Sequence, residues 1–147
     1  FRFLDGETAV AVADDRLIMY KGGQKPAEQA QQFIADEILS VYANNGYVGV
    51  ILRSDELDKR YKMEVFNQEA EKEGTYYINM DYEEIVFAED YYMAYNRKQC
   101  YIQTYKGLVK FDGDFLGAVE VMYPVGKGKG YKYVLVSKSS IDTIQLK

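Results

Sequence analysis

A long internal repeat constrains the fold of this chain more than any other feature of its sequence. Segments 34–51 and 78–95 align without a gap, and each runs from an extended apolar stretch through a polar turn into a strand that begins with tyrosine. The same register places strand starts 39, 44 and 40 residues apart, at Thr8, Tyr47, Tyr91 and Tyr131. Spacings of this size are typical of β-propeller blades, each of which is a four-stranded antiparallel sheet.

Turn-forming residues separate the short apolar segments of the chain. Asn44-Asn45-Gly46, for example, favours the left-handed backbone of a tight hairpin. The segments that we expect to be strands are 8–13, 16–20, 31–34, 39–43, 47–52, 61–66, 75–80, 83–88, 91–95, 100–105, 108–111, 118–123, 131–137 and 141–146. At four strands per blade, they make about three and a half blades. The sequence therefore predicts an all-β fold, a β-propeller-like array of antiparallel four-stranded blades.

One segment also fits a helix. Between Pro26 and Tyr42, apolar residues recur three and four positions apart, with proline near the start and Asn44-Asn45-Gly46 after the end. The repeat favours a strand over 37–43, because the matching segment 78–87 has no helical stripe. The alternative is an α+β fold with one helix at about 26–43 packed on an antiparallel sheet.

Length and composition predict a single repeat domain over residues 1–147. The hydrophobic class makes up 48% of the chain and charged residues 28%, which is a globular composition. There is no run of about eighteen apolar residues, so the chain as given is expected to be soluble. It begins with the apolar Phe1, and we expect it to be a carboxy-terminal fragment of a longer protein.

Charge and residue types narrow the functions to be expected. The formal net charge of −5 argues against nucleic acid or an anionic membrane as the main partner and mildly favours basic partners. Histidine is absent, which removes the commonest general base and the commonest metal ligand. We therefore expect no enzyme activity, no catalytic residues, no metal and no cofactor.

Four local motifs have a chemical and a structural interpretation, and the structural one is favoured each time. An acidic cluster could bind a cation but is expected to be a solvated rim. Asp112-Gly113-Asp114 lacks the other ligands of a calcium loop and is expected to be a turn. The segment 126–130 is glycine-rich and basic, but it lacks P-loop spacing and is expected to be a hairpin loop. Cys100 is expected to be buried in a strand. The cluster consists of Asp81, Glu83, Glu84, Glu89 and Asp90.

The 15 tyrosines are the most distinctive candidates for binding, because aromatic rings on a rigid surface can stack on sugars or contact a protein partner. Neighbouring residues of a strand point to opposite faces, so at least one tyrosine of an adjacent pair should lie at the surface or between blades. The predicted surface-binding residues are Tyr76, Tyr77, Tyr91, Tyr92 and Tyr95.

Four segments together also carry a resemblance to a known family. They are EILSVYANNGYVGVILRS (37–54), YKMEVFNQ (61–68), EEIVFAEDYYMAYNRKQCYIQTYKGLVKFDGDF (83–115) and YKYVLVSKSSIDTIQLK (131–147). They resemble the carboxy-terminal blades of a membrane-anchored, propeller-like family of unknown function from Gram-positive anaerobic bacteria. The resemblance implies an anchor before the repeats and an extracytoplasmic location, and it supplies no catalytic residue.

These observations favour a non-catalytic β-propeller-type scaffold for protein–protein interaction at the bacterial cell envelope. The partner would be an unidentified protein or the remaining blades of a ring. An alternative is a ligand- or glycan-binding module that uses exposed tyrosines. A third hypothesis is an enzyme that uses carboxylates, for which Asp81, Glu83 and Glu84 are the candidates.

Overall fold

The fold is all-β in a computed structural model that describes residues 1–125 and 131–146. Within these ranges no residue is helical, and the chain forms 15 strands. The strands are arranged in four antiparallel sheets, three with four strands and one with three. This architecture confirms the predicted array of antiparallel, blade-like sheets.

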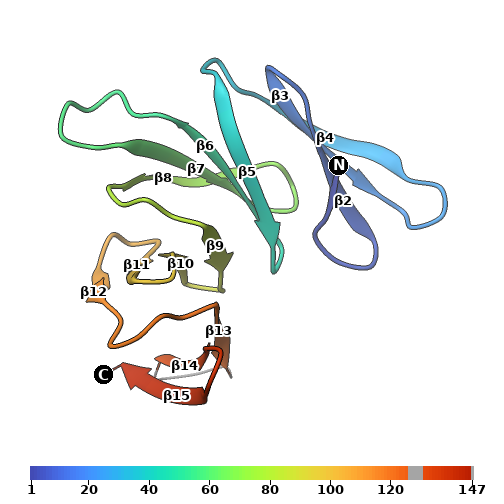
Figure 1. Cartoon of the computed structure of the whole chain (residues 1–147). Coiled ribbons are helices and arrows are strands. Elements are labelled where there is room, and N and C mark those ends of the chain that lie inside the picture. Colours follow the sequence, from blue (N-terminus) through green and yellow to red (C-terminus); the bar gives the residue numbers. More distant parts are fainter. Residues whose placement is uncertain (126–130, 147) are drawn as a thin grey trace. The chain divides into compact units, whose positions relative to one another are not determined.

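The first compact unit, Phe1–Met80, contains two sheets. In each sheet the spatial order of the strands is their order along the chain, so each is a simple meander (Figure 1). The strands of the first sheet are β1 (Arg2–Phe3), β2 (Thr8–Val12), β3 (Arg16–Lys21) and β4 (Ala27–Phe33). Those of the second sheet are β5 (Ile38–Asn44), β6 (Tyr47–Arg53), β7 (Tyr61–Phe66) and β8 (Lys72–Ile78).

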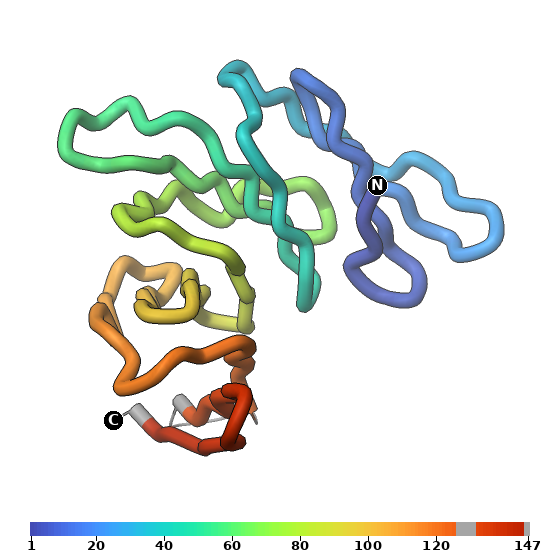
Figure 2. Tube along the Cα trace, viewed as in Figure 1, coloured from blue at the N-terminus to red at the C-terminus, as the bar shows by residue number. Residues whose placement is uncertain are grey.

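The second compact unit, Asp81–Lys147, repeats this organisation. Its chain also passes from each strand to the adjacent one (Figure 2). The strands of the third sheet are β9 (Glu84–Phe87), β10 (Tyr91–Tyr95), β11 (Gln99–Thr104) and β12 (Val109–Asp114). Those of the last sheet are β13 (Val121–Val125), β14 (Tyr131–Val136) and β15 (Ile141–Leu146).

The four repeated strand starts occupy the same place in the four sheets. Thr8, Tyr47, Tyr91 and Tyr131 are the first residues of β2, β6, β10 and β14. Each of these strands lies second in its sheet, with a ladder partner on both sides. Because a strand in this position must satisfy two ladders, its pattern recurs more faithfully than that of an edge strand.

The alternative of a helix at about 26–43 is wrong. The structure places two strands there, β4 and β5, and the expected strand 31–34 proves to be β4, which begins four residues earlier. Backbone pairing of β4 with β3 and of β5 with β6 stabilises both as strands, although the residues of β4 have good helix propensity. The two-residue strand β1 was not predicted.

Each unit has a core between its two sheets. In the first unit, buried side chains of β2 and β3 pack against buried side chains of β6 and β7. In the second unit, side chains of β10 and β11 pack against those of β13 and β14. The first core includes Val10, Leu17, Met19, Val48, Val50, Leu52 and Phe66, and the second includes Tyr91, Met93, Tyr95, Cys100, Ile102, Met122 and Tyr133.

The turn between β5 and β6 confirms the predicted tight hairpin. Asn45 and Gly46 both have positive φ, at 50° and 83°, which is the conformation of a two-residue type I′ turn. A Cβ atom on Gly46 would lie 3.2 Å from Nε2 of Gln68. The same nitrogen donates a 2.8 Å hydrogen bond to Asp5, so this turn is packed against a contact between the first two sheets.

We expect Gly46→Ala to lower the free energy of unfolding by about 1–2 kcal/mol, because a side chain disfavours positive φ and presses on Gln68. Urea titration followed by circular dichroism measures the change. Gly6→Ala is the matched control, since no atom lies within 4 Å of its added Cβ. Equal stability of the two variants would contradict the role assigned to the turn.

Candidate functional site

The largest concave feature that we describe lies in the second unit. It is a cavity of about 890 Å³ bordered by the end of β12, the connection 115–120 and the turn between β14 and β15. Its apolar lining comes from Phe111, Phe115, Val119, Leu135 and Ile144. Cavities of this size with a mainly apolar lining are typical of binding sites.

The rim of this cavity combines an exposed apolar side chain with charged groups. Leu116 is fully exposed. Arg97 and Lys138 supply positive charge to the lining, and the carboxylates come from Asp114, Glu120 and Asp142. An apolar centre with a charged border is the usual anatomy of a protein-binding surface.

A serine-rich turn holds one wall of the cavity in place. The hydroxyl oxygen of Ser137 accepts a 3.1 Å hydrogen bond from the backbone N–H of Ser140. The hydroxyl of Ser140 donates a 2.8 Å hydrogen bond to Asp142. Both bonds join residues of the same turn, so they hold this wall without contacts from other parts of the chain.

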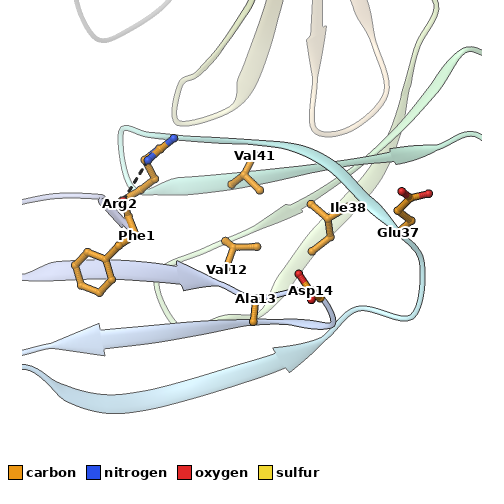
Figure 3. Close-up of a pocket in the computed structure, with 8 residues that line it drawn as sticks. All are labelled: Phe1, Arg2, Val12, Ala13, Asp14, Glu37, Ile38 and Val41. Carbon is orange, nitrogen blue, oxygen red and sulfur yellow. Dashed lines mark hydrogen bonds between the residues drawn. The ribbon is translucent and has the colours of Figure 1, made fainter.

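A second cavity, of about 580 Å³, lies in the first unit between its two sheets. Figure 3 shows Val12, Ile38 and Val41 between Arg2 on one side and Glu37 on the other. The guanidinium of Arg2 donates a 3.3 Å hydrogen bond to the backbone oxygen of Phe1. This cavity has fewer apolar side chains in its lining than the cavity of the second unit.

A charged network in the first unit surrounds Lys62, which is largely buried. Its ammonium group lies 3.0 Å from Asp36 and 3.5 Å from Asp55. The hydroxyl of Tyr77 donates a 3.0 Å hydrogen bond to Asp55. That hydrogen bond lowers the pKa of Asp55, while the hydrogen bond to Asp36 raises the pKa of Lys62. The network ties the connection between the sheets and the loop after β6 to β7 and β8.

The predicted surface of five tyrosines does not form. Tyr76, Tyr91, Tyr92 and Tyr95 are buried, and Tyr77 is half-buried. Tyr91 and Tyr92 are buried together because every residue of β10 is buried, on both faces of the strand. Among the tyrosines proposed as contacts for a ligand or glycan, only Tyr77 is therefore partly accessible.

Several of these tyrosines hold the second unit together instead. The hydroxyl of Tyr95 accepts a hydrogen bond of 3.3 Å from the backbone N–H of Met122, which links β10 to β13. The hydroxyl of Tyr92 donates a hydrogen bond of 2.8 Å to the side chain of Gln103. Such bonds satisfy a buried phenol and are consistent with a structural role.

Three of the local motifs singled out in the sequence are the acidic cluster, Asp112-Gly113-Asp114 and the glycine-rich segment 126–130. The five residues of the acidic cluster are all exposed, and no three acidic, histidine or cysteine side chains in the described ranges are grouped to hold a metal ion. The turn expected at Asp112-Gly113-Asp114 is wrong, because these residues pair with β11 as the end of β12. The glycine-rich segment 126–130 lies outside the described residues.

Cys100 is buried, as the sequence predicted. Burial raises the pKa of its thiol to about 12. The thiol donates a 3.6 Å hydrogen bond to the sulfur of Met122 in the core of the second unit. A thiol in this environment is a packing residue, not a nucleophile.

The fold and its cavities define an all-β protein built from successive meander sheets, with a candidate binding surface in the second unit. The chain belongs to a family of unknown function, DUF5711, whose model matches residues 1–146. No curated protein matches the chain. Residues 1–125 and 131–146 contain no helix that could cross a membrane.

One solved structure similar to this chain is described as "AfRom2 CNH domain". The two share 9% sequence identity with a TM-score of 0.33, and the match covers 95% of this chain. This chain spans 60% of the length of that structure. A likeness at this level does not identify a shared function.

We expect the stabilising effect of Asp55 to depend on pH. Its pKa is lower in the folded chain than the ordinary value of 3.8, so its contribution is present above that value and disappears as the pH falls through the folded pKa. Asp55→Asn should therefore lower stability at pH 7 and have progressively less effect below about pH 4.

Urea titrations of the wild type and Asp55→Asn between pH 3 and 7 measure this difference. Tyr77→Phe removes the hydrogen bond that is the main cause of the lowered pKa, and it should reduce the pH dependence. A stability difference that stays constant over the whole pH range would contradict the assignment.

We expect Cys100 to react slowly with a thiol reagent at pH 8 in the folded protein, because its thiol is buried and protonated. In a concentration of urea that unfolds the chain, the reaction should become as fast as that of a free cysteine. Absorbance of the released thiolate measures both rates. Rapid reaction under native conditions would show that the thiol is accessible.

Proposed function

We propose that this chain is a non-catalytic scaffold that binds another protein through the cavity of the second unit, at the bacterial cell envelope. The observation that carries the proposal is the cavity itself, with its apolar lining and the fully exposed Leu116 at its border. A few side chains that are buried in such pockets, most often aromatic residues or arginine, supply most of the binding energy in protein interfaces.

The charge of the chain favours a partner with basic groups near the contact. Asp114, Glu120 and Asp142 line the cavity, and the chain as a whole has a net charge of −5. Complementary charge speeds the encounter and excludes partners of the wrong sign. The partner is therefore expected to present an apolar side chain flanked by lysine or arginine.

Two parts of the proposal do not rest on the cavity: that the chain is non-catalytic, and that it is located at the cell envelope. The chain has no histidine to act as a general base. Location at the cell envelope is supported by the resemblance to a family whose repeats follow a membrane anchor.

Site-specific photo-crosslinking in the cells that produce the protein tests the proposal. A photoreactive residue in place of Leu116 should give one discrete crosslinked product, because a bound partner covers this position. The same residue in place of Leu57 is the matched control, since Leu57 is also fully exposed but does not line this cavity. No product at position 116, or the same products at both positions, would contradict the proposal.

A substitution gives a second test of the same surface. Leu116→Asp should reduce the yield of the product formed from a photoreactive residue at Ser139, an exposed position in the cavity lining, at least tenfold, whereas Leu57→Asp should leave it unchanged. The reason is that a carboxylate at the border both removes the apolar contact and must be desolvated on binding. Undiminished crosslinking in Leu116→Asp would show that the cavity does not hold the partner.

A further inference from the structure

The connection between β12 and β13 is fixed to the rest of the second unit at two points. The backbone N–H of Phe115 donates a 2.7 Å hydrogen bond to the carbonyl oxygen of Lys98. The backbone N–H of Val119 donates a 2.9 Å hydrogen bond to the carbonyl oxygen of Arg97. The two acceptors are consecutive residues of the turn between β10 and β11, so residues 116–118 form a short tip between two closely spaced anchors.

The tip is apolar, which is unusual for an exposed loop. It consists of Leu116, Gly117 and Ala118, and all three residues are exposed. Exposed loops are normally rich in polar residues such as serine, asparagine and aspartate. Leu116 is fully exposed, and a Cβ atom added to Gly117 would have no atom within 4 Å. The tip therefore packs little against the rest of the chain in this structure.

The same three residues border the apolar cavity of the second unit. They share its lining with Leu135 and Ile144, which are only half-buried. Apolar surface is thus exposed to water both on the tip and inside the cavity. Bringing the two surfaces together would remove both from water, which is favourable. The tip is therefore suited to cover the cavity.

The backbone of the tip allows such a movement without a change in the sheets. Gly117 lies at its centre, and glycine has more backbone freedom than any other residue. The hydrogen bonds of Phe115 and Val119 hold the two ends, and Val119 is buried. Movement of a lid needs only a few residues that absorb the change in backbone angles. Leu116 can therefore change position while its anchors stay in place.

We propose that residues 116–118 are a lid, which closes when an apolar side chain of the partner enters the cavity and places Leu116 against that side chain. This inference rests on the function proposed for the cavity and adds how the bound side chain is retained. The structure shows the open position, in which Leu116 is in water. In the closed position Leu116 separates the bound side chain from water, so release must wait for the lid to open.

An apolar dye in place of the partner tests the lid on the purified chain. Anilinonaphthalene sulfonate is the probe, and stopped-flow fluorescence measures its rates of entry and release. Thr143→Trp, at an exposed position in the cavity lining, should fill part of the cavity and weaken dye binding. Dye binding that is unchanged in Thr143→Trp would show that the cavity takes no apolar guest, and it would contradict both the proposed function and the lid.

Two substitutions in the tip distinguish a lid from a fixed rim. Leu116→Ser should speed release of the dye about tenfold, because the closed lid loses its apolar contact, and it should leave entry unchanged. Gly117→Ala should speed release about threefold, because alanine restricts the backbone and fits the open position, where the φ of Gly117 is not positive. Gly6→Ala is the matched control, since its added Cβ also has no atom within 4 Å.

The result for Gly117→Ala is decisive, because its added methyl group touches nothing in the open structure and a fixed rim would not respond to it. Circular dichroism establishes that the variants are folded. Release at the wild-type rate from both Leu116→Ser and Gly117→Ala, together with weakened binding in Thr143→Trp, would overturn the lid. That outcome would leave the cavity as a binding site and the proposed function intact.

Discussion

The structure depends on burying both faces of small antiparallel sheets. Strand β10 has five residues and all of them are buried, and five of the seven residues of β6 are buried as well. A meander of four short strands cannot bury two apolar faces by itself, so it is stable only with neighbours. The core of each unit is the first result of this constraint, because each unit pairs two sheets.

The sequence correctly predicted where the second strand of every sheet begins. It predicted β4, an edge strand of the first sheet, less well. The starts at Thr8, Tyr47, Tyr91 and Tyr131 are correct because each of these strands pairs with a neighbour on both sides, so a similar strand-forming pattern recurs each time. Strand β4 has mostly exposed residues and one ladder, so its alanine and glutamine content resembled a helix. Backbone pairing with β3 outweighed the local helix propensity of these residues, and β4 is therefore a strand.

The candidate site was harder to predict than the fold. Tyrosine counts indicated a binding surface, but a tyrosine on a strand with two buried faces packs in the interior, and its hydroxyl finds a partner there, as those of Tyr92 and Tyr95 do. The cavity of the second unit combines residues from three separate segments, between Arg97 and Ile144. No spacing in the sequence brings them together, although the apolar Phe115-Leu116 after a strand end was a signal that could have been used. Burial of Cys100 was predictable because strand β11 alternates.

The meander order of the strands in every described sheet has a consequence for how proteins of this kind change in length. A complete meander carries all of its own ladder pairs, so gain or loss of one leaves the strand pairing of the other sheets unchanged. A partial insertion would leave an apolar face without a cover. Gain and loss of whole meanders, in steps close to the repeat spacings of 39, 44 and 40 residues, is therefore the change in length that this architecture tolerates best.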